Sequence, residues 1–496
     1  MLKRISGIFI ILSSVLIFGC GNGGGNSANT TAAPTTVYEN PGDIIDNGNN
    51  TDESAAREKS SLPEEMDFSG REFRVITRNV ERIYEEFAVE EETGDPIIDA
   101  LYKRNLRIEE KYNTVIKQTN VSDPSSVISK AVKAGDYSYE LIIDTMANIR
   151  NLASQSALLD LYKVPYISDD LSKPWWNQAL KRDLSINGKL YFQSGDIVMK
   201  DKLRMAVMYF NKDMFQTLGL EYPYKYVYDG TWTIDKLSEI TKGVNFDLNG
   251  DGIMDQYDRW GFMAQHEASF HFYAAAGERT VTLNKDGVPE ITMNTPRSME
   301  VIQKVLDICT DGVTMFHADK IKGADNVWLT ASAYFQEDRF LMRSSVFEPI
   351  VRDLRAMPTD FGLLPYVKFD EKQENYYSWV EISGYYLGIP NNADESFAGF
   401  ITESLAYESG DTLMPAFYDL CLRSKVLRDN ESEGMLDIIF NSKVYDIGYI
   451  YGIGELSSVL SNMTSSGNTD FTSRYERISG AAERALQKFI DSYDSE

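Results

Sequence analysis

The sequence predicts an α/β protein built on a parallel sheet. Short apolar, β-type runs at 73–77, 115–118 and 140–144 alternate with stretches of helical spacing at 96–112 and 125–134. Apolar residues recur on one face of each helical stretch. A β-α-β-α-β order needs helical crossovers, and such crossovers favour parallel strands.

The same alternation continues through the rest of the chain. Strand-like runs occur at 205–209, 260–263, 361–364 and 385–389, and helical stripes at 233–241, 296–310, 397–407 and 481–493. The 496 residues with 43% hydrophobic side chains are enough for two or three domains with real cores.

The formal charge of −26 limits the partners of this chain. It becomes −28 if Lys3 and Arg4 are removed with an N-terminal signal. An acidic surface of this size repels nucleic acid and anionic lipid headgroups, so no nucleic-acid partner is expected. A strongly anionic ligand would need a local basic pocket.

Cysteine and histidine are too scarce for several kinds of chemistry. Beyond the N-terminal segment only Cys309 and Cys421 remain, which allows one disulfide at most; buried free thiols are the alternative. His266 and His271 are five residues apart, whereas the zincin motif needs four. No catalytic zinc site or nucleophile elbow is expected, and the chain is not predicted to be an enzyme.

The N-terminus has the features of a secretory signal. Lys3 and Arg4 precede a short apolar run, and Ile17, Gly19 and Cys20 resemble a bacterial lipobox. The resemblance implies removal of residues 1–19, a signal peptide, and lipidation of Cys20 with palmitate or a similar acyl chain. The alternative is an ordinary cleaved signal with a chance cysteine. Residues 20–62, which start at the lipidated Cys20, are polar and predicted to be a disordered tether with a reach of roughly 35 Å.

The strand at 140–144 ends in a candidate site. Ligands of α/β sheets bind beyond the carboxyl ends of strands, which points to Asp144, Thr145 and Asn148. A helix N-cap is the structural alternative for Asp144.

The segment 247–258 matches the spacing of a twelve-residue calcium loop. Side-chain oxygens occur at positions 1, 3, 5, 9 and 12, Gly252 stands at position 6, and the residue at position 7 would offer its carbonyl. The predicted ligands are Asp247, Asn249, Asp251, Ile253, Asp255 and Asp258. A helix precedes the loop, with Thr233 as its expected N-cap, and a strand follows it. We therefore expect half an EF-hand with a structural Ca²⁺, the alternative being an acidic turn without metal.

Aromatic residues make up 12% of the chain, several of them in polar, loop-like settings. Examples are Trp175, Trp176, Trp232, Trp328 and Trp379. Aromatic rings stack on the C–H faces of sugars while neighbouring polar groups bind hydroxyls. Core packing is the alternative for each single ring. Trp176 and Trp379 are predicted ligand contacts.

Several segments together resemble extracellular solute-binding proteins of family 1, the carbohydrate-binding lipoproteins of ABC importers. They include residues 139–144, 187–191, 209–213, 230–233 and 360–365, together with the acidic loop. The resemblance implies a type II periplasmic-binding-protein-like fold with two discontinuous α/β lobes. Lobe 1 would comprise residues 63–193 and about 362–425, and lobe 2 residues 194–361 and about 426–496, joined by hinge crossings.

The resemblance also implies a ligand cleft and a function. It places Gln265, His266, Phe347, Glu348 and Trp379 in the cleft, with the loop after Asp144. The expected function is capture of a sugar or oligosaccharide for an ABC permease by hinge closure. The protein would be a monomer, lipid-anchored on the extracellular face of the cell membrane or periplasmic. The alternatives are a glycan-active surface hydrolase or lyase, and a sensing or adhesive lipoprotein without an importer.

Overall fold

The structure is a computed structural model that describes residues 57–79, 87–354, 357–422 and 430–494. The predicted signal peptide, Cys20 and residues 21–56 of the expected tether lie outside the described residues. The last part of that tether is described, and it is docked: the Ser60 hydroxyl donates to Asp170 over 2.8 Å. Within the described ranges, no helix is both long and apolar enough to cross a membrane.

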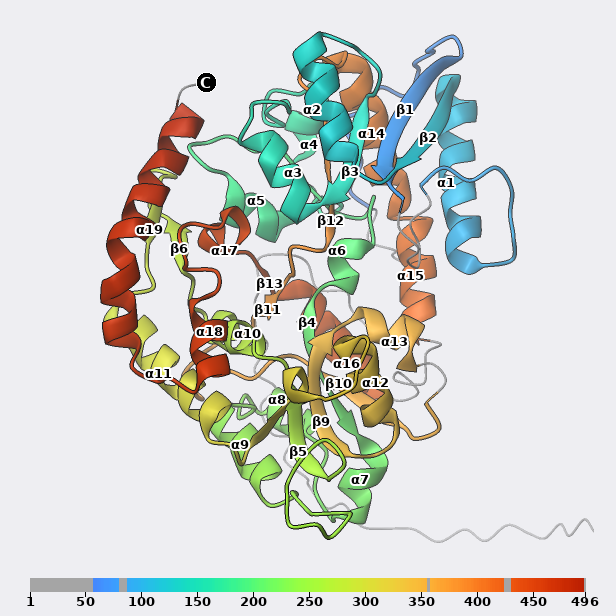
Figure 1. Cartoon of the computed structure of the whole chain (residues 1–496). Helices are drawn as coiled ribbons and strands as arrows, with labels where there is room; N and C mark the ends of the chain where they lie inside the picture. Colours follow the sequence, from blue (N-terminus) through green and yellow to red (C-terminus); the bar gives the residue numbers. More distant parts are fainter. Residues whose placement is uncertain (1–56, 80–86, 355–356, 423–429, 495–496) are drawn as a thin grey trace, which may run out of the picture. The chain divides into compact units, whose positions relative to one another are not determined.

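The first sheet has the strand order β12-β3-β1-β2 (Figure 1). Its strands are β1 (Arg71–Arg78), β2 (Thr114–Val121), β3 (Leu141–Thr145) and β12 (Tyr385–Gly388). β1 is parallel to both β2 and β3, and β12 is antiparallel to β3. The predicted β-α-β-α-β unit with parallel strands is confirmed.

Helices α1 (Pro96–Tyr112) and α2 (Pro124–Ala134) connect these parallel strands. The bounds of α1 follow from its ends. The Asp95 side chain accepts the backbone N–H groups of Ile97 and Ile98, Pro96 occupies the first turn, and Asn113 ends the helix at φ 48°. The next helices are α3 (Met146–Ala153), α4 (Ile167–Asp170), α5 (Gln178–Leu184) and α6 (Lys200–Leu203).

The second sheet has the order β10-β4-β9-β5-β8. Its strands are β4 (Ala206–Asn211), β5 (Trp260–Ala264), β8 (Met315–His317), β9 (Phe340–Val346) and β10 (Phe361–Leu364). β5 is parallel to β8 and β9, whereas β4 is antiparallel to β9 and β10. The central strand β9 was not among the sequence predictions. In Figure 1 its amber ribbon lies beside the green strands β4 and β5.

Helices and short elements surround this sheet in sequence. They are α7 (Lys212–Thr217), α8 (Tyr224–Tyr228), α9 (Ile234–Lys242), α10 (Ala268–Ala275), the hairpin of β6 (Val281–Leu283) and β7 (Pro289–Ile291), α11 (Pro296–Thr310), the 3₁₀ helix η1 (Ala318–Lys320), α12 (Val327–Gln336) and α13 (Glu348–Arg352). The predicted helices at 233–241 and 296–310 are confirmed, and the Thr233 hydroxyl caps α9 at Lys236 N–H.

The C-terminal part adds helices and one small sheet. Its elements are β11 (Ser378–Trp379), which pairs with β13 (Lys443–Val444), and α14 (Glu395–Ser409), α15 (Leu413–Leu422), α16 (Asn430–Asn441), α17 (Ile447–Tyr451), α18 (Val459–Ser466) and α19 (Phe471–Asp494). α14 packs against α1, and α16 packs against β10, so both sheets receive helices from this part.

The chain passes from the first sheet to the second after β3 and returns after β10. The segments that make these passages meet: Gln193 pairs with Leu387, and Met205 pairs with Val380. The lobe boundaries given above stay a prediction. Both sheets belong to one unit, Ala55–Glu496.

Candidate ligand-binding site

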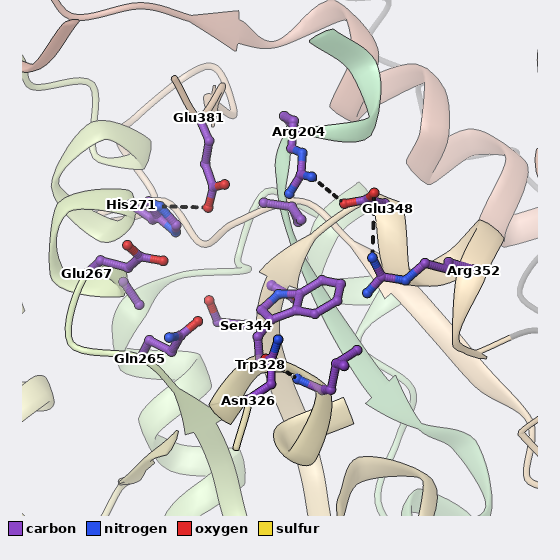
Figure 2. Close-up of a pocket in the computed structure, with 14 residues that line it drawn as sticks. Arg204, Gln265, Glu267, His271, Asn326, Trp328, Ser344, Glu348, Arg352 and Glu381 are labelled. Carbon is purple, nitrogen blue, oxygen red and sulfur yellow. Dashed lines mark hydrogen bonds and ion pairs between the residues drawn. The ribbon is translucent and has the colours of Figure 1, made fainter. Parts of the chain in front are cut away.

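A pocket of about 380 Å³ lies at the edge of the second sheet where the parallel strands β5 and β9 end (Figure 2). This edge is the usual ligand position of α/β sheets, and the volume is typical of small-molecule sites. The lining residues are Arg204, Gln265, Glu267, Ala268, His271, Asn326, Trp328, Leu329, Ser344, Ser345, Val346, Glu348, Arg352 and Glu381.

Local structure explains how these side chains come together. Gln265 follows β5 directly, and Glu267 and His271 stand four residues apart at the start of α10, on one helix face. Glu348 and Arg352 have the same spacing on α13, which follows β9. Helices that begin at the carboxyl ends of β5 and β9 therefore supply Glu267, Ala268, His271, Glu348 and Arg352 to the pocket.

One side of the pocket carries two arginines around one carboxylate. Arg204 Nη2 lies 2.7 Å from Glu348 Oε2, and Arg352 Nη1 lies 3.7 Å from Glu348 Oε1. The Glu348 side chain is only 3% exposed, so its charge needs this pairing. Arg352 also donates from Nε and Nη2 to Asp353, over 2.7 and 2.9 Å, so the two arginines of this side are matched by two carboxylates.

The other side of the pocket is acidic. Figure 2 shows Glu267, His271 and Glu381 grouped together, with Glu381 Oε1 3.9 Å from His271 Nε2. Burial lowers the pKa of His271 to about 4, so its ring is neutral at neutral pH. Burial first, and then the charge of Glu267, raise the pKa of Glu381 to about 8.

Trp328 supplies the aromatic surface of the pocket. The half-buried indole lies with its ring centroid 4.2 Å from Arg352 Cζ, and Asn326 caps its helix by accepting Leu329 N–H. A flat apolar face beside amide, hydroxyl and charged groups suits a polar ring-shaped ligand. The sequence marks Trp328 only as an aromatic residue in a polar setting.

Among the predicted ligand contacts, the structure brings Gln265 and Glu348 into this pocket. His266 is adjacent but turned away: its backbone N–H donates to Asp319 over 2.7 Å, and its ring lies 4.6 Å from that of His317. The ligand roles of all these residues stay predictions.

The residues at the end of β3 do not line the pocket. Asp144 is fully buried and accepts the Arg78 guanidinium, with Nε 2.8 Å from Oδ1. It also accepts Ser125 Oγ, and Asn148 donates to it over 3.2 Å. Asp144 is not an N-cap either, because Thr145 holds that position of α3, without a side-chain hydrogen bond. Its carboxylate is occupied by protein groups.

The other predicted aromatic contacts are core residues. Trp176 and Trp379 are 1% exposed, and Phe347 is fully buried. Trp176 Nε1 donates to Glu403 over 2.8 Å, Trp379 packs on Phe270, and Phe347 packs on Phe440. These three rings therefore pack in the core, as the alternative interpretation of single aromatic residues expected, and do not line the pocket.

Sequence reasoning did not single out the charged pocket residues Arg204, Glu267, Arg352 and Glu381. Glu267 and Arg352 each follow a strand end by a few residues, so a search of the helix starts after β5 and β9 could have found them. Arg204 and Glu381 lie on the passages between the sheets, where Glu381 N–H donates to Arg204 O over 3.0 Å. No local pattern marks that contact.

The acidic loop has the expected surroundings, with α9 before it and β5 after it. Gly252 adopts φ 79°, and the Asp247 carboxylate accepts the N–H groups of Gly250 and Gly252. In the described part of the chain, no three His, Cys, Asp or Glu side chains come close enough together to hold a metal ion. Calcium binding stays a prediction. Cys309 is a buried free thiol, which excludes a disulfide with Cys421.

No protein-family model matches the chain, and no curated protein matches it in sequence. Solved structures do match. The ABC substrate-binding protein Lmo0181 from Listeria monocytogenes, in complex with cycloalternan, has a TM-score of 0.51 at 16% identity over 86% of this chain and 98% of its own. A cyclo/maltodextrin-binding protein complexed with maltotetraose has a TM-score of 0.55 at 14% identity over 86% and 97%. UspC from M. tuberculosis has a TM-score of 0.53 at 14% identity over 83% and 100%.

These similarities extend over nearly the whole length of the solved chains. The fold is therefore the two-lobe α/β fold of ABC solute-binding proteins. This confirms the fold class that the sequence resemblance implied.

Proposed function

We propose that this protein captures a sugar or oligosaccharide for an ABC importer and releases it chemically unchanged. The observation that carries the proposal is the pocket at the carboxyl ends of β5 and β9, where the Trp328 ring lies among amide, hydroxyl and charged groups. A ring for stacking and convergent polar groups for hydroxyls are what a sugar needs.

The solved relatives suggest where to begin the ligand search. Two of them hold oligosaccharides, cycloalternan and maltotetraose. Thermal-shift screening of mono- and oligosaccharides, followed by calorimetric titration, tests the proposal. Stoichiometric binding without turnover supports a receptor, whereas product release supports the hydrolase or lyase alternative. Failure of every glycan in the panel to bind would contradict the proposal.

Binding is proposed to work by hinge closure. A ligand that contacts both lobes only in the closed form shifts the equilibrium toward that form by its differential affinity. Small-angle scattering should report a smaller radius of gyration with a tight-binding sugar than without it. An unchanged radius would argue against closure.

The proposed location is the outer face of the cell membrane, where a lipidated Cys20 would hold a monomer near its permease. The N-terminal pattern of Lys3, Arg4 and Ile17-Phe18-Gly19-Cys20 supports this. Incorporation of an alkyne fatty acid into wild type and not into Cys20→Ala tests the anchor. Permease genes beside this gene would favour import over a sensing or adhesive role.

We also propose that the loop 247–258 takes a structural Ca²⁺. Oxygen donors at the required spacing and the positive φ of Gly252 support it. The carboxylates now accept backbone N–H groups and would have to turn free oxygens toward the ion, so affinity is the quantity to measure.

A further inference from the structure

The carboxylates of the pocket differ in whether an arginine forms an ion pair with them. Of its three carboxylates, Glu348 lies between Arg204 and Arg352. Glu267 and Glu381 form no ion pair with a lysine or arginine among the described residues; the only basic group within 4.0 Å of either is His271.

His271 does not compensate this charge. Its side chain is 5% exposed, its Nδ1 contacts the Tyr366 hydroxyl over 3.1 Å, and burial keeps it neutral. Other groups near Glu381 are the Ser383 hydroxyl, which donates over 3.3 Å, and the charges of Arg204 and Glu348, which oppose each other. The phenols of Tyr366 and Tyr449, both neutral at neutral pH, lie near it as well. No lysine or arginine of the described residues therefore forms an ion pair on this side of the pocket.

We propose that the glycan bound here carries an amino group, as a glucosamine-type residue does, and that its ammonium lies against Glu267 and Glu381 while a sugar ring stacks on Trp328. This inference rests on the proposed function and specifies its substrate class. A sugar hydroxyl satisfies a carboxylate lone pair but leaves the charge in place. An ammonium does both, and hydrogen bonds to charged groups are about twice as strong as neutral ones.

One ligand can contact both sides of the pocket, the side with Arg204 and the side with Glu267 and Glu381. Arg352 donates from Nε and Nη2 to Asp353 and pairs with Glu348 through Nη1. Arg204 pairs with Glu348 through Nη2, so its remaining N–H groups are available for ring and hydroxyl oxygens. Figure 2 places Trp328 near Arg352, with Glu267 and Glu381 on the other side of the pocket. An amino sugar presents an ammonium and several neutral oxygens on one ring, which matches this division.

Proton release gives the proposal a second readout. Free Glu381 is mostly protonated at pH 6.5, because burial and Glu267 hold its pKa near 8. A bound ammonium favours the ionised carboxylate, so binding should release up to about one proton per ligand.

The test is calorimetric titration at pH 6.5 of the protein with three probes of equal length. They are the β-1,4-linked glucosamine trimer, its N-acetylated and therefore neutral counterpart, and maltotriose. Titration in two buffers of different ionisation enthalpy measures the protons released. The variants are Glu267→Gln and Glu381→Gln, and the matched control is Glu290→Gln on the exposed side of β7, outside the pocket.

The amine trimer should bind about tenfold or more tightly than the acetylated one and should release protons. Each pocket variant should remove most of that preference, Glu381→Gln should also abolish proton release, and Glu290→Gln should change neither. Equal or tighter binding of a neutral trimer would overturn the inference and leave the sugar-receptor function standing. If none of the three trimers binds and a wider glycan panel also fails, both proposals are overturned.

Discussion

Glu403 on α14 permits a quantitative test of the core. Its two carboxylate oxygens accept the indole N–H groups of Trp175 and Trp176, over 2.7 and 2.8 Å. The side chain is fully buried and has no ion pair among the described residues, and Asp170 lies close by. Burial is the main reason that the pKa of Glu403 is raised to about 8, with a further contribution from the charge of Asp170.

A raised pKa in the folded state has a definite effect on stability. Below pH 4.5, the ordinary value, Glu403 is protonated in both states. Between pH 4.5 and about 8, the unfolded chain has lost the proton while the folded protein keeps it, so the free energy of unfolding falls as pH rises. From pH 5 to pH 8 the loss is roughly 3 to 4 kcal/mol, at about 1.4 kcal/mol per pH unit away from the two pKa values.

Glu403→Gln removes this titration. Glutamine keeps one acceptor oxygen for one indole and turns its NH₂ group toward the other, which costs about 1–3 kcal/mol at every pH. The variant should be less stable than wild type at pH 5 and should gain on it by roughly 3 kcal/mol at pH 8.

Urea unfolding of both proteins at pH 5, 6, 7 and 8 measures this difference. Glu395→Gln, at an exposed position of the same helix, is the matched control and should parallel wild type. If the difference between Glu403→Gln and wild type does not change with pH, the argument from burial is wrong.

Three further predictions concern the pocket, the core and the acidic loop. Trp328→Ala should weaken sugar binding about tenfold through loss of stacking, whereas Tyr257→Ala, 52% exposed and outside the pocket, should leave the calorimetric Kd unchanged. Gly261→Ala should destabilise the fold by about 2–3 kcal/mol, because a Cβ there would lie 2.1 Å from Thr241 O; in the same denaturation assay Gly243→Ala, with nothing within 4 Å, should cost far less. Millimolar Ca²⁺ should raise the melting temperature of wild type and not of Asp247→Asn. If Ca²⁺ shifts the melting temperatures of both proteins equally, the ion does not bind in the loop 247–258.

Local patterns were sufficient to predict the three parallel strands of the first sheet and the two helices between them, but not the antiparallel pairing of β12. Asp95 and Pro96 begin α1, Asn113 ends it, and the apolar run of β3 follows α2, so each element carries its own signal. β9 was missed although it is the centre of the second sheet. Its partners β4 and β5 are both distant in sequence, and one of them runs antiparallel. A strand whose neighbours come from different parts of the chain is defined by pairing rather than by local periodicity.

Only those site residues that closely follow a strand along the chain could be predicted from the sequence. The family resemblance, not the carboxyl-end rule, placed Gln265 and Glu348 in the cleft, and in the structure both residues closely follow the ends of β5 and β9. Trp176 lies in the core and not in the pocket, and the reason is a contact with a distant part of the chain that no local sequence pattern indicates. Its indole N–H donates to Glu403, 227 residues later in the chain, and that hydrogen bond fixes the ring in the core.

The two sheet edges differ in a way that supports the proposed ligand site at the second sheet. At the carboxyl edge of the first sheet, β1 ends in Arg78 and β3 ends next to Asp144, and the two side chains neutralise each other over 2.8 Å. Removing either one would leave a buried charge without its partner, so this pair is structural. At the corresponding edge of the second sheet, neither Glu267 nor Glu381 forms an ion pair with an arginine or lysine in the part of the chain that the structure describes. At the carboxyl edge of the first sheet, Arg78 therefore neutralises the carboxylate of Asp144. At the same edge of the second sheet, the ammonium group of the proposed ligand would take the corresponding place beside Glu267 and Glu381.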